Sequence, residues 1–73
     1  MNLGKAMMDI REEAAMSRAD VAKALGITTG ALWKIENGKT QPKPATIARF
    51  CREMKVELAR LYCTAFEAED YRL

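Results

Sequence analysis

The sequence contains no histidine among its 73 residues. Histidine is the commonest general base near neutral pH and the commonest nitrogen ligand of zinc. The chain also has no nucleophile–base set and no glycine-rich loop that could hold a phosphate, so we expect no enzyme activity. Its two cysteines, Cys51 and Cys63, have no paired C-x-x-C partner. We therefore expect no metal or cofactor site, and we interpret both cysteines as small buried or half-buried hydrophobes.

Long apolar runs are missing as well. No stretch approaches the roughly 20 apolar residues of a membrane span, and residues 1–8 hold no apolar run of the length that a signal peptide needs. We expect a reduced, cytoplasmic protein with no membrane partner. A chain of 73 residues forms one domain, here residues 1–73, with a core too small to enclose a deep catalytic pocket.

Charge is unevenly distributed along the chain, although the net charge is only +2. Residues 17–60 hold nine Lys/Arg and four Asp/Glu, a net charge of +5, whereas residues 61–73 hold one arginine and three acids, a net charge of −2. The basic middle suggests a polyanion partner, and the acidic end suggests a different role. A solvated surface of mixed charge would give the same counts, so charge alone does not decide.

The rest of the chain is organised around residues 18–38, which read as two short helices joined by a tight turn. Their inner faces are apolar at helical spacing: Val21, Ala22 and Leu25 in the first, Leu32 and Ile35 in the second. Gly26, between them, can adopt a positive φ and so end one helix and turn the chain sharply. This combination predicts a helix-turn-helix motif.

Three further helices complete an all-α, five-helix fold. The first covers about residues 3–14, another begins at Pro44, and a fifth covers about residues 57–71. Ser17 and Thr28 are predicted to cap the two motif helices. Ala15 stands where a glycine would be expected to end the first helix, a departure that costs about 1 kcal/mol if its backbone is left-handed.

Arg11 lies at the edge of the apolar face of the first helix, so at least its stem should be partly buried. Such an arginine needs an acceptor, and Glu36, on the second motif helix, is the obvious candidate. We predict a structural ion pair that holds these two helices together.

The outer face of the second motif helix carries Trp33 and Lys34. We favour a groove contact over plain solvation for Lys34, while guanine and phosphate both remain open as its partner. For Trp33, contact with the groove or a sugar and packing on a neighbouring helix are equal alternatives. Arg18 begins the first motif helix, where a cation is unfavourable to the helix dipole, and this favours a phosphate partner over a structural role.

The fifth helix has an apolar stripe that includes Leu58, Tyr62 and Phe66. Little protein is left to cover these three side chains. We therefore favour a dimer interface over a simple core position for them.

Several segments in order match a known family: IREE in the first helix, VAKALGIT through the turn, KIENGKTQP after it, and KVELARL at the start of the last helix. Over about residues 3–62 the chain resembles the lambda-repressor-like family of helix-turn-helix proteins, also called Cro/CI-type or Xre-type. The resemblance implies a five-helix fold that binds double-stranded operator DNA of two-fold symmetry as a homodimer.

The resemblance also implies the residues that contact DNA. Arg18 matches a position that touches the backbone; the groove positions are Thr28, Thr29, Gly30 and Lys34; and the phosphate-contacting end of the helix is Asn37, Lys39 and Thr40. Trp33 and Lys43 complete our candidate set. The chain departs from the family at Gly30, which offers no side chain, at Trp33, where the family is polar, and at Lys55, which replaces a glycine.

Two functions remain open. The first is a sequence-specific transcriptional regulator, a dimeric repressor of a phage, mobile element or restriction-modification system. The second is an antitoxin-type interaction protein that binds DNA but chiefly neutralises a partner protein through residues 57–73.

Overall fold

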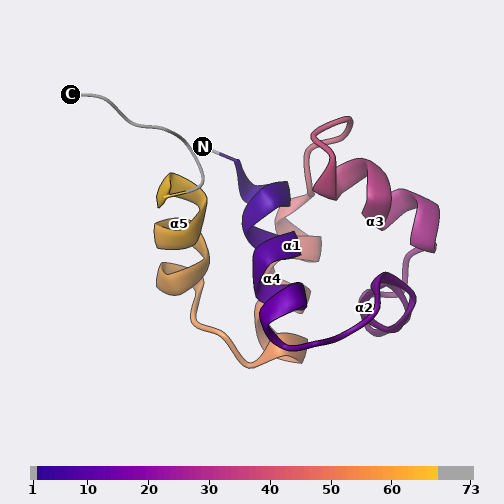
Figure 1. The fold of residues 1–73 in the computed structure, drawn as a ribbon, viewed down its shortest axis with the longest axis horizontal. Coiled ribbons are helices and arrows are strands. Elements are labelled where there is room, and N and C mark those ends of the chain that lie inside the picture. The colour runs from indigo at the N-terminus through magenta and orange to yellow at the C-terminus, as the bar shows by residue number, and fades with distance from the viewer. Residues whose placement is uncertain (1, 68–73) are drawn as a thin grey trace.

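A computed structural model describes residues 2–67 of the chain, and within this range every regular secondary-structure element is an α-helix. Its five helices are α1 (Leu3–Glu13), α2 (Arg18–Leu25), α3 (Thr29–Glu36), α4 (Pro44–Met54) and α5 (Leu58–Glu67) (Figure 1). The predicted all-α, five-helix fold is confirmed. The predicted continuation of the last helix to about residue 71 lies outside the described residues.

Helices α1 and α4 lie in the middle of the domain, with α2 and α3 on one side and α5 on the other (Figure 1). α1 packs on both α3 and α5, while α4 packs on α2 and α5. All five helices contribute to a single core, whose largest fully buried side chains are Met7, Val21, Leu32, Phe50 and Leu61. The helix-turn-helix pair α2–α3 is therefore held at one side of a common core.

Gly4 sets how closely α1 approaches α3. The residue is buried, and a Cβ atom at this position would collide with the backbone carbonyl oxygen of Ile35. The first turn of α1 thus rests directly on the main chain of α3. The sequence pattern gives no sign of this contact, because a glycine near a helix start fits many other structural roles.

Each of the first four helices ends with a residue of positive φ. Two of these are the glycines Gly26 and Gly38, with φ of 71° and 73°. The other two are Ala15 and Lys55, both with φ of 56°. The left-handed backbone expected at Ala15 is confirmed, and Lys55 adopts the conformation of the glycine that it replaces.

The same hydrogen-bond pattern closes all four of these ends. After each left-handed residue, the next backbone N–H donates five residues back, as in the Met16–Arg11 bond of 3.2 Å and the Lys39–Lys34 bond of 2.8 Å. This is the Schellman motif. At three ends the residue after the left-handed one is apolar and packs against the core: Met16, Ile27 and Val56. At the fourth it is Lys39, which is exposed.

Both predicted caps of the motif helices are confirmed. The Ser17 hydroxyl accepts a hydrogen bond of 3.0 Å from the backbone N–H of Asp20. The Thr28 hydroxyl accepts one of 3.0 Å from the backbone N–H of Ala31. α2 and α3 therefore begin where the sequence predicts.

The expectation for the cysteines is correct for one of the two. Cys51 is half-buried against the core, and its burial raises the pKa of the thiol, which stays protonated near neutral pH. Cys63 is exposed, so its predicted burial is wrong. It stands two residues from both Leu61 and Ala65, the buried residues of α5, and a step of two residues turns a side chain to the far side of a helix.

Candidate nucleic-acid interface

The outer face of α3 is open to solvent. Its exposed residues are Thr28, Thr29, Gly30, Trp33, Lys34 and Asn37. Trp33 has 43% of its surface exposed and is not part of the core. Leu32 and Ile35, on the opposite side, are buried as predicted. α3 thus presents a polar face with one large aromatic side chain.

An open concavity of about 500 Å³ lies between the start of α3, the loop that follows it and the start of α4. The predicted residues that line it include Thr28, Gly30, Lys34, Thr40 and Lys43. Two lysines and two threonines from separate segments are brought together there. The structure adds two polar residues that the sequence analysis missed, Gln41 and Thr46. In the sequence, Gln41 directly precedes Pro42, and Thr46 lies two residues after Pro44, and neither position by itself indicates a binding role.

Gly30 is not required by the fold. Its backbone is helical, and a Cβ atom there would meet no other atom within 4 Å. The missing side chain therefore leaves the helix backbone open to whatever approaches this face.

The two ends of α3 keep polar groups available after capping. The Thr28 oxygen accepts a bond from the backbone, which leaves its hydroxyl hydrogen able to donate. The Asn37 side-chain nitrogen donates a bond of 2.9 Å to the Trp33 carbonyl and keeps a second hydrogen. Both residues are exposed, so both can still contact a ligand.

Glu36, the last residue of α3, binds two arginines at once. Arg11 Nε donates to Glu36 Oε2 at 2.8 Å, and Arg11 Nη2 donates to Oε1 at 3.3 Å. Arg18 Nε donates to the same Oε1 at 2.8 Å. The predicted Arg11–Glu36 pair is confirmed. The bond from Arg18 to Glu36 does not follow from the sequence pattern.

Basic side chains surround the α3 face. Arg18 is half-buried, while Lys34, Lys39 and Lys43 are exposed. Glu36 contributes no exposed negative charge, because its side chain is only 1% exposed and is paired. The face therefore has the positive surface charge that attracts a polyanion.

Comparison with known proteins decides the family. The model of a family described as "Helix-turn-helix domain" matches residues 3–68. The chain belongs to this helix-turn-helix family. Membership of this family identifies the chain as a DNA-binding transcriptional regulator. Among curated proteins no sequence matches.

Among solved structures, the helix-turn-helix chain is similar to the clp gene regulator ClgR from C. glutamicum. The two align with a TM-score of 0.91 at 20% sequence identity, over 97% of this chain and 92% of the other. At this identity the likeness establishes the fold. The five-helix helix-turn-helix fold predicted from the sequence is thereby confirmed.

The helix-turn-helix domain has a second, apolar concavity away from α3. It has a volume of about 350 Å³ and is lined by Pro44, Ile47, Ala48, Cys51, Leu58 and Tyr62 of α4 and α5. Leu58 is 52% exposed beside it, and Phe66, two turns further along α5, is 46% exposed. We call this surface the α4–α5 hollow. The apolar stripe predicted for α5 therefore has two parts. Leu61 and Ala65 face the core, whereas Leu58 and Phe66 are exposed at the surface.

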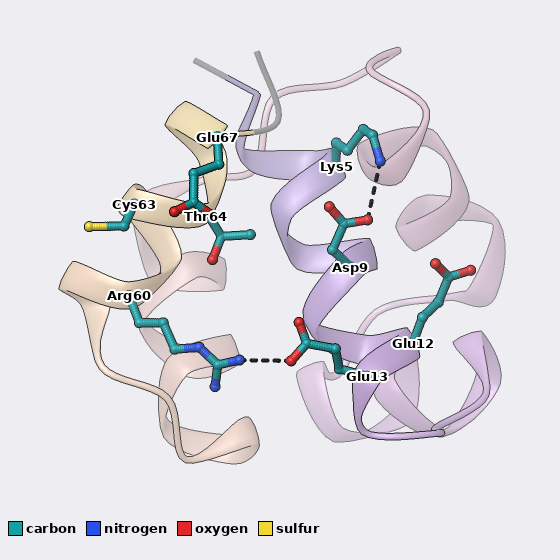
Figure 2. A pocket seen from close by; sticks show the side chains of 8 residues that line it. All are labelled: Lys5, Asp9, Glu12, Glu13, Arg60, Cys63, Thr64 and Glu67. Carbon is teal, nitrogen blue, oxygen red and sulfur yellow. Dashed lines mark hydrogen bonds and ion pairs between the residues drawn. The ribbon is translucent and has the colours of Figure 1, made fainter. Parts of the chain in front are cut away.

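A polar groove of about 950 Å³ lies between α1 and α5 (Figure 2). Arg60 reaches across it to Glu13 at 2.8 Å, and Lys5 pairs with Asp9 along α1 at 3.2 Å. The first of these pairs ties α5 to α1. Within residues 2–67, no cluster of His, Cys, Asp or Glu could hold a metal ion, and no helix is long and apolar enough to span a membrane.

Proposed function

We propose that the chain is a sequence-specific regulator that binds double-stranded DNA as a homodimer and represses transcription from a two-fold-symmetric operator. The observation that carries this proposal is the exposed face of α3, flanked by basic side chains and anchored at its end by Glu36. The resemblance to lambda-repressor-like proteins favours a repressor of a phage, mobile element or restriction-modification system.

In this proposal α3 enters the major groove. The start of a recognition helix contacts base edges, so Thr28, Thr29, Trp33 and Lys34 are the residues that read sequence. Gly30, which has no side chain, lets the helix approach the base pairs closely. Phosphate contacts fix the orientation of the protein on the duplex. They come from the start of α2 and from the end of α3 and its loop, at Arg18, Asn37, Lys39, Thr40 and Lys43.

The occupant that we propose for the α4–α5 hollow is a second copy of the chain. Leu58, Tyr62 and Phe66 then form the centre of the interface. α5 lies across the domain from α2 and α3 (Figure 1). A two-fold axis beside α5 would therefore leave both recognition helices outermost, as is needed to reach two major grooves about 34 Å apart.

Selection of bound duplexes from a random DNA pool tests the proposed function. We expect an enriched sequence with two-fold symmetry. Sedimentation should show a dimer that Leu58→Glu converts to a monomer, because a buried carboxylate without a partner strongly opposes association. Cys63→Glu is the matched control, since it adds the same charge to the same helix at an exposed position outside the hollow.

The antitoxin-type alternative predicts other results. A chain that stays monomeric, that enriches no sequence, and that co-purifies with a small co-encoded protein would favour it. Residues 68–73, part of the predicted contact segment, lie outside the described residues.

A further inference from the structure

Arg18 adds a positive charge that the protein does not neutralise. The Glu36 carboxylate is already paired with Arg11 through two hydrogen bonds, and the side chains of these two residues are only 1% and 9% exposed. Arg18 then places a second guanidinium on the same carboxylate. The three side chains together carry a net charge of +1.

The position of Arg18 is unfavourable for a purely structural cation. It is the first residue of α2, where the helix dipole opposes positive charge. Asp20, in the same turn, forms no ion pair with it in the described part of the chain. The Arg18 side chain is 32% exposed, so it is partly open to a ligand. An anion bound from outside the protein would stabilise the positive charge of Arg18 at this position.

The bond to Glu36 uses only one of the five N–H groups of Arg18. It is made through Nε, and within residues 2–67 no other acceptor binds this guanidinium. The four N–H groups on Nη1 and Nη2 remain. Because a guanidinium is planar, holding Nε fixes the plane in which these groups lie.

We infer that Glu36 is a positioning residue for DNA binding: it holds Arg18 through Nε so that both terminal nitrogens donate to one backbone phosphate. The inference rests on the proposed function. In helix-turn-helix proteins the first motif helix crosses the DNA backbone, and Arg18 begins that helix. A phosphate accepts two parallel bonds from such a fork.

Arginine and lysine should differ at this position. A lysine in place of Arg18 would keep the positive charge but has no Nε, so it could not hold Glu36 and present a planar fork at once. Arg18→Lys therefore removes the planar guanidinium but keeps the positive charge, whereas Arg18→Gln removes both.

The test is to titrate a random-sequence DNA duplex with wild type, Arg18→Lys and Arg18→Gln over a series of KCl concentrations. Arg18→Gln should lower the slope of log K against log salt by about 0.9, the value for one lost phosphate contact. Arg18→Lys should keep a near-wild-type slope but bind about 5–10-fold more weakly, the equivalent of one hydrogen bond. Arg52→Gln, which removes an exposed charge from the last turn of α4, should change neither quantity.

Thermal melts and nitrogen-15 spectra complete the design. The Arg18 Nε–H signal of the wild type should persist in the complex, because Nε stays on Glu36, while its Nη signals shift. Loss of the Nε–H signal in the complex, or wild-type affinity in Arg18→Lys, would overturn the positioning role. An unchanged slope in Arg18→Gln with a lowered melting temperature would make Arg18 structural only. No salt-dependent binding by wild type would instead reject the proposed function.

Discussion

Arg11 and Glu36, 25 residues apart in sequence, join α1 to the end of α3 through hydrogen bonds of 2.8 and 3.3 Å. Arg11 also donates through Nη1 to the Met16 carbonyl at 2.9 Å. One side chain therefore ties together α1, the turn before α2, and α3. The pair belongs to the framework that orients the interface.

Arg11→Ala should destabilise the domain by roughly 3 kcal/mol. Breaking a buried pair costs about 3–5 kcal/mol, and the lower end applies because Arg18 still binds Glu36. The measurement is urea unfolding. Arg60→Ala, which breaks the exposed pair with Glu13, is the control and should cost at most about 1 kcal/mol. Equal losses in the two variants would contradict a special role for the buried pair.

Ala15→Gly should stabilise the protein by about 0.5–1 kcal/mol. A left-handed backbone costs an alanine about 1–2 kcal/mol, from which the greater unfolded-state freedom of glycine must be subtracted. The neighbouring change Ala14→Gly should destabilise it by a similar amount, because Ala14 is right-handed, with φ of −79°. Thermal melts of the two variants should therefore shift in opposite directions. Shifts of the same sign would count against the strain at Ala15.

Gly4→Ala and Gly30→Ala should also have opposite effects on stability. The new methyl at position 4 meets the Ile35 carbonyl, so we expect a loss of about 1–3 kcal/mol, as for other overpacked sites. At position 30 it meets open space, and helix propensity should give a gain of up to about 1 kcal/mol. The Gly30→Ala variant should nevertheless bind its operator more weakly if the helix backbone lies close to the bases. Tighter operator binding would show that the missing side chain has no part in recognition.

Lys39→Ala should weaken binding to all DNA sequences alike and lower the salt slope of log K by about 0.7–0.9. Lys39 is exposed in the loop after α3, with its backbone fixed by the bond to Lys34. Affinity is measured on the selected operator and on unrelated DNA at several salt concentrations. A loss confined to the operator would instead assign Lys39 to base reading.

Trp33→Ala should lower the affinity for the operator by at least about 1 kcal/mol while the melting temperature stays near that of wild type. The side chain lies outside the core, and an apolar surface there can contact thymine methyl groups. Fluorescence of Trp33, the single tryptophan, should be quenched by the operator and not by unrelated DNA. An equal loss on both DNAs would make Trp33 a general contact, and a collapsed melt would make it structural.

Buried helix faces and helix caps were predictable from the sequence, because each depends on residues close together in the chain. Helical spacing identified the buried faces of α2 and α3, and side-chain chemistry identified the caps Ser17 and Thr28. The Arg11–Glu36 pair followed from one half-buried charge that needed one acceptor. The sequence therefore contained the fold and the outline of the candidate interface.

Features that depend on how two distant segments meet were not predictable. The contact of Gly4 with the α3 backbone and the second arginine on Glu36 both arise from the relative positions of helices. Gln41 and Thr46 line the concavity beside α3 only because the loop folds next to this helix. The burial predicted for Cys63 is wrong because this residue, two positions from both Leu61 and Ala65, lies on the opposite side of α5 from the core.

The four Schellman ends differ in one respect that bears on how such a regulator diversifies. Met16, Ile27 and Val56 anchor three of the turns in the core, whereas Lys39 leaves the turn after α3 unanchored at that position. Under the proposed function, exchanges among the exposed residues that follow, such as Lys39, Thr40 and Lys43, would therefore alter phosphate contacts at little expense in folding free energy. The overall affinity for DNA can therefore change through this segment without a compensating change in the core.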